Sequence, residues 1–350
     1  MTRAESELQG ELIPLEQFQD WDQRIAAYPQ KRIFHESAWL RFLASDHRGE
    51  AMVLRVSTRD GEERVLWPGI VVRKIPIRIF GSPLRGWGTP VMGPLFHDQD
   101  ARFIVPAAEA AFGRARVHHW EFVSESLRPP EGGGNSGYRY ETSDTHRIAL
   151  HSEESVMWAS VEQRCRTAVR KATKNGLTCR IAQDAKFLEP MFRFVEAIFA
   201  RKKTTVSYDL GRLRRLWDAM HPLGKAVGLE VRLGEQLAAA GVFIFDDRQA
   251  FAWSEASDSA FNPLGPNNLL YWEAMRHFGA RGMSYLHLPG AAGSPIGKFK
   301  ASFNPEVLSY PFWIHDRHRL LRWGRRAYQE MYSLRAKWRY LLSSRERKGS

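Results

Sequence analysis

Two lysines near the end of the chain have the type and spacing to do chemistry. The segment GKFKASF, residues 297–303, places Lys298 and Lys300 on either side of Phe299, at the end of the glycine-rich run PGAAGSPIG. Alternating cations and aromatic rings fit three arrangements. They are a platform on which nucleic-acid bases stack, a strand with one solvated face, and a cation held in a reaction site.

A second set of cations lies on a predicted helix over residues 155–175, which ends at Gly176. Arg166, Arg170 and Lys174 follow one another at intervals of four residues, so they share one helical face. Such a row is either a solvated basic face or a cradle for a phosphate or carboxylate, for which arginine offers paired hydrogen bonds. Arg201, at the end of the following helix, is a further candidate for anion binding.

The segment FAWSEASDSAFNPLGPNNLL, residues 251–270, reads as a strand, a loop and the start of a helix. Phe251 and Trp253 alternate on one face of the strand, either as core residues or as a shelf for a ligand. Glu255 is either solvated or a general base toward an ammonium acceptor. Asn267 or Asn268 is expected to cap the helix, whose free amides can receive an anion.

The elements around these residues predict an α+β fold with mixed, mostly antiparallel sheets. In each half of the chain a helix precedes three meandering strands, and further helices and strands follow. Helices are expected at about 36–45, 100–116, 155–175, 185–202, 209–220 and 267–282. Strands are expected at 51–56, 64–72, 75–80, 118–123, 145–150, 177–182, 226–233, 236–245, 249–257, 283–288 and 306–314, and residues 128–137 read as a loop. This order argues against a doubly wound nucleotide-binding fold, and no P-loop or GxGxxG follows a strand.

Composition places the 350-residue chain among globular proteins of one or two domains, with 43% hydrophobic and 26% charged residues. The two cysteines, Cys165 and Cys179, predict no disulfide framework and a reducing compartment. The start of the chain has no secretory signal pattern, and no apolar run is long enough to span a membrane. We therefore expect a soluble cytoplasmic protein.

The net charge of +12 is concentrated in the tail. From residue 317 to residue 348 there are eleven Lys or Arg and two Glu, a net +9, so the body is close to neutral. The tail is expected to be a basic amphipathic helix over 316–350, with Trp323 and Trp338 on its apolar stripe. That stripe either packs on the body or lies at an anionic membrane surface, which fits a basic tail at least as well as nucleic acid does.

Four segments, taken in order, carry a resemblance to a known family. RTAVRKATKNGL, AAGVFIF with QAFAWSEAS, PNNLLYWEAMRHFGARGMSYLHL and GKFKASF resemble the second domain of the FemABX-like transferases, part of the GNAT acetyltransferase superfamily that includes BioF2-like domains. The resemblance covers about residues 150–313, and FHESAWLRFL and GSPLRGWGTP resemble the first domain more loosely. It implies two tandem GNAT-like domains, residues 1–150 and 151–315, with a cleft between them.

The resemblance also implies a reaction, the transfer of an acyl or aminoacyl group onto an amine. Lys300, in the F-K-x-x-F strand of the family pattern, would contact the donor carbonyl and stabilise the oxyanion that develops during attack. Phe299 and Phe303 would be packing residues. Two differences from the family pattern leave the identity of the acyl donor open. FAWSE lacks the tyrosines of peptidoglycan-modifying members, and NPLGPNN lacks the R/Q-x-x-G-x-G/A motif that binds acetyl-CoA.

The sequence therefore predicts an N-acyltransferase that acts on a cell-envelope or exopolysaccharide precursor. An aminoacyl-tRNA-dependent, peptidoglycan-type ligase and a non-catalytic, membrane-associated scaffold with a decayed site are the alternatives. The candidate residues are catalytic Lys300 and Glu255, with Arg166, Arg170, Lys174, Arg201, Trp253, Asn267 and Asn268 for substrate and anion binding. The expected donor is acyl-CoA such as acetyl-CoA, or else aminoacyl-tRNA, with no metal. The expected partners are a small or lipid-linked amine and an anionic surface at the inner face of the membrane, with tRNA as a partner in the ligase alternative. No interaction with DNA is expected.

Overall fold

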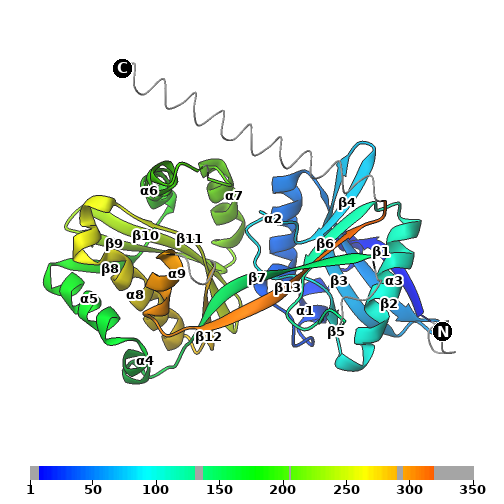
Figure 1. Ribbon diagram of the computed structural model, residues 1–350, viewed down its shortest axis with the longest axis horizontal. Coiled ribbons are helices and arrows are strands. Elements are labelled where there is room, and N and C mark those ends of the chain that lie inside the picture. Colours follow the sequence, from blue (N-terminus) through cyan, green and yellow to red (C-terminus); the bar gives the residue numbers. More distant parts are fainter. Residues whose placement is uncertain (1–7, 131–136, 205, 290–294, 319–350) are drawn as a thin grey trace, which may run out of the picture. The chain divides into compact units, whose positions relative to one another are not determined.

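The computed structural model describes residues 8–130, 137–204, 206–289 and 295–318 (Figure 1). Within them the fold is α+β with mostly antiparallel strand pairing, as the order of elements predicted. Most of the tail expected as a helix over 316–350, and the centre of the loop at 128–137, lie outside the described residues.

The contacts within the chain divide it into two compact units. The first runs to Ser143 and takes up the chain again from Ser309, and the second comprises Asp144–Leu308. Both divisions fall inside strands, β7 (Tyr138–Ala149) and β13 (Glu306–Asp316), so each strand contributes residues to both units. The boundaries predicted at 150 and 315 lie a few residues further along the chain than these two.

The first unit is a twisted sheet with helices packed against it. Its strands are ordered β1-β2-β3-β4-β6-β13, with β4 and β6 parallel and the other pairs antiparallel. The aromatic residues Trp67, Phe112 and Trp120 are fully buried at the centre of its core. Its other elements are β1 (Leu8–Pro14), α1 (Trp21–Ile25), α2 (Ser37–His47), β2 (Glu50–Thr58), β3 (Glu63–Lys74), β4 (Ile77–Ser82), β5 (Leu95–Phe96), α3 (Ala101–Arg114) and β6 (His119–Val123).

A buried histidine gives the first unit a predicted sensitivity to acid. His35 is 2% exposed, and its Nδ1 accepts a hydrogen bond from the amide of Arg32 at 3.1 Å. Burial, and then the charge of Arg32, lower the pKa of His35 from 6.5 to about 3. Between these two values the unfolded chain binds a proton that the folded chain does not, so stability falls as the pH falls, by about 1.4 kcal/mol per pH unit.

We expect His35→Asn, which can still accept the hydrogen bond from Arg32, to flatten this dependence. Urea unfolding of both proteins at pH 7 and pH 4.5 measures the pH dependence of stability. The wild type should lose more stability on acidification than the variant. Equal losses in the two proteins would show that His35 is not the group responsible.

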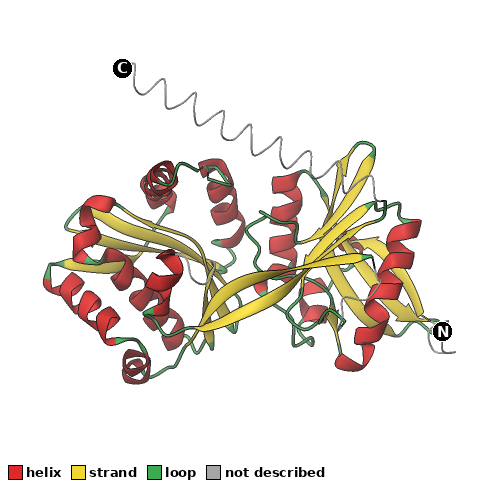
Figure 2. Ribbon diagram, viewed as in Figure 1, coloured by secondary structure: helices red, strands yellow, loops and turns green. Residues whose placement is uncertain are grey.

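The second unit is a sheet covered by helices on both faces (Figure 2). Its strands are ordered β7-β12-β11-β10-β9-β8, with β11 and β12 parallel. Helices α4, α5 and α8 form a core cluster with one face, and α6 packs on β11 from the other. Its elements are α4 (Glu154–Ser160), α5 (Gln163–Lys174), β8 (Leu177–Ile181), α6 (Leu188–Arg201), α7 (Leu210–Met220), β9 (Ala226–Leu233), β10 (Gln236–Phe245), β11 (Gln249–Ser257), α8 (Pro266–Ala280), β12 (Tyr285–Pro289) and α9 (Pro295–Ala301).

The single helix predicted over 155–175 is wrong, because the chain forms two helices there. Val161 and Glu162 adopt extended backbone between α4 and α5. The amide of Glu162 donates to the carbonyl of Ser302 at 3.0 Å, a tertiary partner that replaces the helical one. The predicted end at Gly176 is confirmed, since its φ of +82° is a left-handed conformation that glycine adopts without strain.

Lys300 lies in the short helix α9 and not in a strand, which corrects the F-K-x-x-F strand prediction. Phe299 and Phe303 are four residues apart, and their rings are 5.6 Å apart at 72°. Both rings also contact Tyr271 of α8 at 5.6 Å. Packing of this aromatic pair against α8 therefore holds Lys300 at its place in the unit.

Strand β11 contains a bulge at Trp253. Its neighbour β10 pairs Val242 with Ser254 and Phe243 with Ala252, so Trp253 is an extra residue. Bulges re-aim the side chains that follow them. Regular alternation from Phe251 therefore does not continue to Glu255, since Phe251 stacks on His287 while Glu255 bonds to Tyr271 of α8 on the opposite face.

Among the helices that the structure describes, none has the length and apolar character needed to cross a bilayer.

Candidate functional site

A buried cation and a carboxylate meet between β11 and α9. Lys300 is 2% exposed, and its Nζ lies 3.5 Å from Oε1 of Glu255. The same oxygen accepts a hydrogen bond from the hydroxyl of Tyr271 at 2.6 Å. The structure thus brings together the two predicted catalytic residues, which are 45 positions apart in the sequence, and adds a tyrosine.

Tyr271 is the hydroxyl donor of this Lys300–Glu255–Tyr271 cluster. Burial, and then the charge of Glu255, raise the pKa of Tyr271 well above its ordinary value. Tyr271 therefore stays protonated and donates to Glu255. Glu255 in turn lies beside Lys300, so the carboxylate has a hydroxyl donor and a cation as neighbours.

A second group of polar side chains lies on the other face of β11. The hydroxyls of Tyr208 and Ser254 are 2.7 Å apart, and the Tyr208 ring contacts Trp253 at 5.0 Å. The guanidinium of Arg212 lies 5.9 Å from the centre of the Trp253 ring. Trp253, predicted to bind substrate, is thus half-buried among Tyr208, Ser254 and Arg212.

A pocket of about 280 Å³ lies at the start of α8. Arg201, Asn267 and Asn268, all predicted to bind anions, line it together with Phe299 and Ser257. Phe299 precedes Lys300 directly and Ser257 is two residues beyond Glu255, so the pocket adjoins the cluster. Its other lining residues are Ile198, Asn262, Gly265 and Pro266.

The helix start at this pocket differs from the prediction, because neither asparagine is the N-cap. Gly265 caps α8 with a φ of +79°, and Pro266 is the first helical residue. A Cβ at position 265 would lie 3.2 Å from the carbonyl oxygen of Ala168, so a glycine also allows this close approach. The amides of Asn267 and Asn268 belong to the first turn, where no carbonyl within the helix accepts them.

This first turn fits one anionic group. Two backbone amides, the positive end of the helix dipole and the exposed guanidinium of Arg201 suit a phosphate or a carboxylate. The side chain of Asn267 donates to Ser257 at 2.8 Å, which holds it against β11. The residues therefore fit a phosphate of a donor, even without the glycine motif of acetyl-CoA-binding relatives.

The row of cations on α5 is not brought to this site. Arg166 donates to the carbonyls of Trp158, Ala159 and Val161, where it caps the end of α4. Arg170 and Lys174 line a different groove, beside Trp158. The shared face predicted from their spacing exists on the helix, but it lies apart from Lys300 and Glu255.

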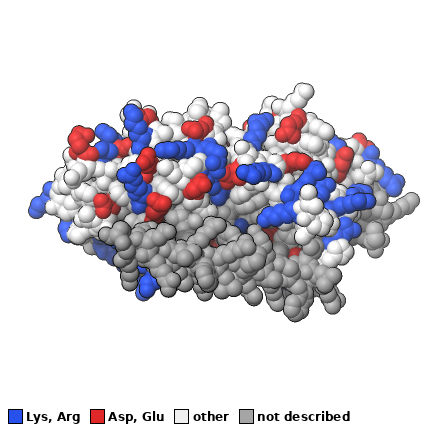
Figure 3. Space-filling view, turned by 90° about the horizontal axis from the view of Figure 1, so that it is seen from above, with Lys and Arg blue, Asp and Glu red and all other residues white. Residues whose placement is uncertain are grey.

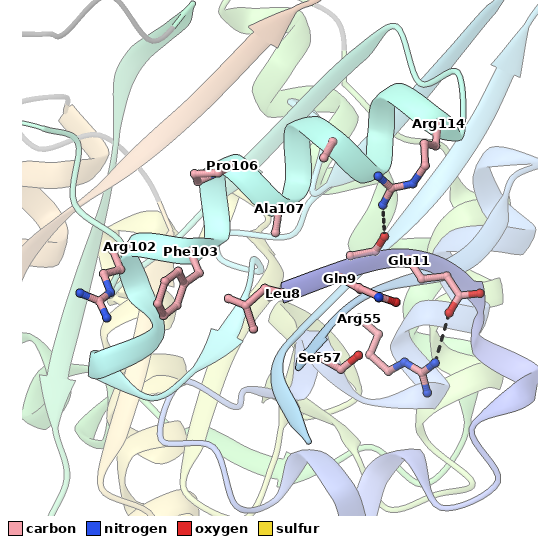
Figure 4. Close-up of a pocket in the computed structure, with 12 residues that line it drawn as sticks. Leu8, Gln9, Glu11, Arg55, Ser57, Arg102, Phe103, Pro106, Ala107 and Arg114 are labelled. Atoms are coloured by element: carbon pink, nitrogen blue, oxygen red, sulfur yellow. Dashed lines mark hydrogen bonds and ion pairs between the residues drawn. The ribbon is translucent and has the colours of Figure 1, made fainter. Parts of the chain in front are cut away.

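The basic side chains visible in Figure 3 do not form a continuous track. On the face that Figure 3 shows, acidic side chains lie among the basic ones. A cavity of about 810 Å³ between β1 and α3 of the first unit contains three arginines, of which Arg55 bonds to Glu11 and Arg114 to the carbonyl of Gly10 (Figure 4). None of the residues that line this cavity is Lys, His, Cys or Tyr.

Sequence reasoning missed Tyr271, Tyr208 and Ser254. The absence of tyrosines in FAWSE suggested that hydroxyl groups were lacking, whereas two tyrosines reach β11 from α8 and from the segment before α7. One signal was available, because Tyr271 is the only residue with a hydroxyl in the apolar run LLYW. No group of His, Cys, Asp or Glu suited to a metal ion occurs among the described residues.

Comparison with known proteins gives this geometry a context. Residues 159–300 match the family model described as an acetyltransferase (GNAT) domain. No curated protein sequence matches the chain. The matched segment lies in the second unit and includes the residues of the cluster and of the pocket.

Solved structures extend the likeness to both units. The crystal structure of FemX has a TM-score of 0.66 at 13% identity, over 84% of this chain and 95% of that one. A tandem GNAT protein from the clavulanic acid biosynthesis pathway has a TM-score of 0.51 at 12% identity, over 89% and 99%. The C-terminal domain of a putative lysylphosphatidylglycerol synthetase from Agrobacterium fabrum has a TM-score of 0.50 at 15% identity, over 80% and 88%. The chain has a FemABX-like GNAT fold.

Proposed function

We propose that this protein is an N-acyltransferase that moves an acetyl or other acyl group, or an aminoacyl group, onto an amine of a cell-envelope or exopolysaccharide precursor. The observation that carries the proposal is the buried Lys300 beside Glu255, next to a pocket lined by Arg201, Asn267 and Asn268, within the segment that matches the GNAT family model. The resemblance to FemX and to a lysylphosphatidylglycerol synthetase domain supports an envelope substrate at the level of fold.

The chemistry follows from where charge develops. When an amine attacks a thioester or ester carbonyl, the carbonyl oxygen becomes negative, and a preorganised cation nearby stabilises it. Lys300 supplies that cation. Glu255, which accepts a hydrogen bond from Tyr271, pairs with the ammonium and is the carboxylate that would accept a proton from the attacking amine.

The donor we propose is an acyl-CoA, which supplies an activated thioester carbonyl and phosphate groups. Asn267, Asn268 and Arg201 would hold one phosphate at the start of α8. An aminoacyl-tRNA also has an activated carbonyl and phosphates, so the same pocket suits the alternative donor.

One experiment separates the three functional hypotheses. The full chain is incubated with acetyl-CoA and a panel of amines that includes amino sugars, and separately with aminoacyl-tRNA and the same panel, with and without ribonuclease. Thiol release supports acyl-CoA as donor, and ribonuclease-sensitive transfer supports the ligase alternative. Transfer in neither arm would contradict the proposal and favour a scaffold with a decayed site.

Removing Arg201 should weaken donor binding and leave the chemical step nearly intact. A charge-assisted hydrogen bond to phosphate contributes about 1.5–3 kcal/mol, so Arg201→Ala should raise the KM for the donor roughly 10- to 100-fold with kcat changed far less. Lys202→Ala, next in the chain, is the matched control. If both variants have the same KM, Arg201 does not contact the donor.

A further inference from the structure

The second unit has a groove outside the proposed reaction site, between α4, α5 and α8. This Trp158–Trp272 groove has a volume of about 610 Å³. The two indole rings form its apolar floor, with their centres 4.6 Å apart in an edge-to-face arrangement, and Val169 lies beside them. Arg170 and Lys174 of α5 stand at its rim.

The rim is positive and available to a ligand. Helix α5 has five Lys or Arg and no acidic residue between Gln163 and Lys174. Within the described part of the chain, neither Arg170 nor Lys174 forms an ion pair, and the one acidic lining residue, Glu154, is bridged to Arg276 at 2.8 Å. The groove therefore fits a ligand that is anionic at one end and apolar at the other.

The rings of this groove are poorly placed to stack nucleic-acid bases. The guanidinium of Arg170 lies over the Trp158 ring, 5.4 Å from its centre. Trp272 is only 4% exposed. A base needs an open aromatic face, whereas an acyl chain needs only apolar walls.

We propose that the Trp158–Trp272 groove docks the protein on an anionic phospholipid surface. Lipid phosphates pair with Arg170 and Lys174, and the upper part of an acyl chain contacts Trp158 on the floor of the groove. Indole, guanidinium and ammonium groups beside an apolar surface are typical of protein segments that bind at a membrane interface. This contact is independent of the acyl donor and of the reaction site.

Vesicle co-sedimentation of the full chain tests the proposal. The probes are vesicles of phosphatidylglycerol mixed with phosphatidylcholine, and vesicles of phosphatidylcholine alone. The variant is Arg170→Ala with Lys174→Ala, both exposed, and the charge-matched control is Lys202→Ala with Lys203→Ala at the end of α6. The basic C-terminal tail is identical in all three proteins, so differences between them report the groove.

We expect the groove variant to bind the anionic vesicles about five-fold more weakly per cation removed, or roughly 25-fold in total at low salt. The control variant should bind the anionic vesicles more tightly than the groove variant does. This difference in affinity should shrink at 1 M salt, where charges are screened beyond about 3 Å. Equal binding by the two variants would overturn the proposal. A variant that keeps vesicle binding but loses binding to fluorescent bulk tRNA would also overturn it, in favour of a nucleic-acid surface.

Discussion

Replacing Lys300 by methionine is expected to slow acyl transfer about 10²–10³-fold, the usual effect of losing one oxyanion contact. Methionine has nearly the length of lysine and no charge, so it can occupy the same buried space. Glu255 keeps the hydrogen bond from Tyr271, and its side chain is 21% exposed, so water can solvate the remaining charge. The melting temperature should therefore change little.

Lys298→Met is the matched control for this experiment. Lys298 lies on the same short helix, two residues away, and is exposed. Initial rates of thiol release from acetyl-CoA, together with thermal melts, measure both variants. Near-normal turnover of Lys300→Met would remove Lys300 from the mechanism, and a collapsed melting temperature would give it a structural role instead.

The second large effect is expected from Glu255→Ala, and it concerns stability. The substitution leaves the ammonium of Lys300 in a site that is 2% exposed and without its carboxylate. Removing one partner of a buried ion pair costs about 3–5 kcal/mol. We expect a loss near 3 kcal/mol in the free energy of unfolding, since Glu255 is itself partly exposed.

A double substitution tests this cause. Glu255→Ala combined with Lys300→Met removes both charges, so most of the lost stability should return. Urea unfolding of the wild type, the two single variants and the double variant completes the cycle. If the double variant is as unstable as the sum of the single ones, the two side chains are not coupled and Glu255 does not position Lys300.

The elements with strong local signals could be predicted from sequence. The strands expected at 226–233, 236–245 and 249–257 are β9, β10 and β11 with the same bounds, because alternating apolar residues and short turns determine them locally. The predictions failed where a contact with a residue distant in the sequence determines the local structure. The break before α5 depends on the carbonyl of Ser302, more than a hundred residues away.

Lys300 shows the same limit for the site. The pattern K-F-K-A-S-F alternates, which suggests a strand, but it also sets Phe299 and Phe303 four residues apart, which suits a helix. Contact of both rings with Tyr271 favours the helix, and only the tertiary structure contains that contact. The spacing of Arg166, Arg170 and Lys174 was likewise correct for a helix, yet it could not indicate that Arg166 caps α4.

The bulge at Trp253 has a consequence for how relatives of this chain should be aligned. Because β11 has one residue more than β10 at this point, an alignment with an unbulged strand requires a one-residue gap at Trp253. Without the gap, every position after it is shifted by one. Glu255 would then be matched with a side chain of the opposite face, and a shared carboxylate beside the lysine would be scored as a difference.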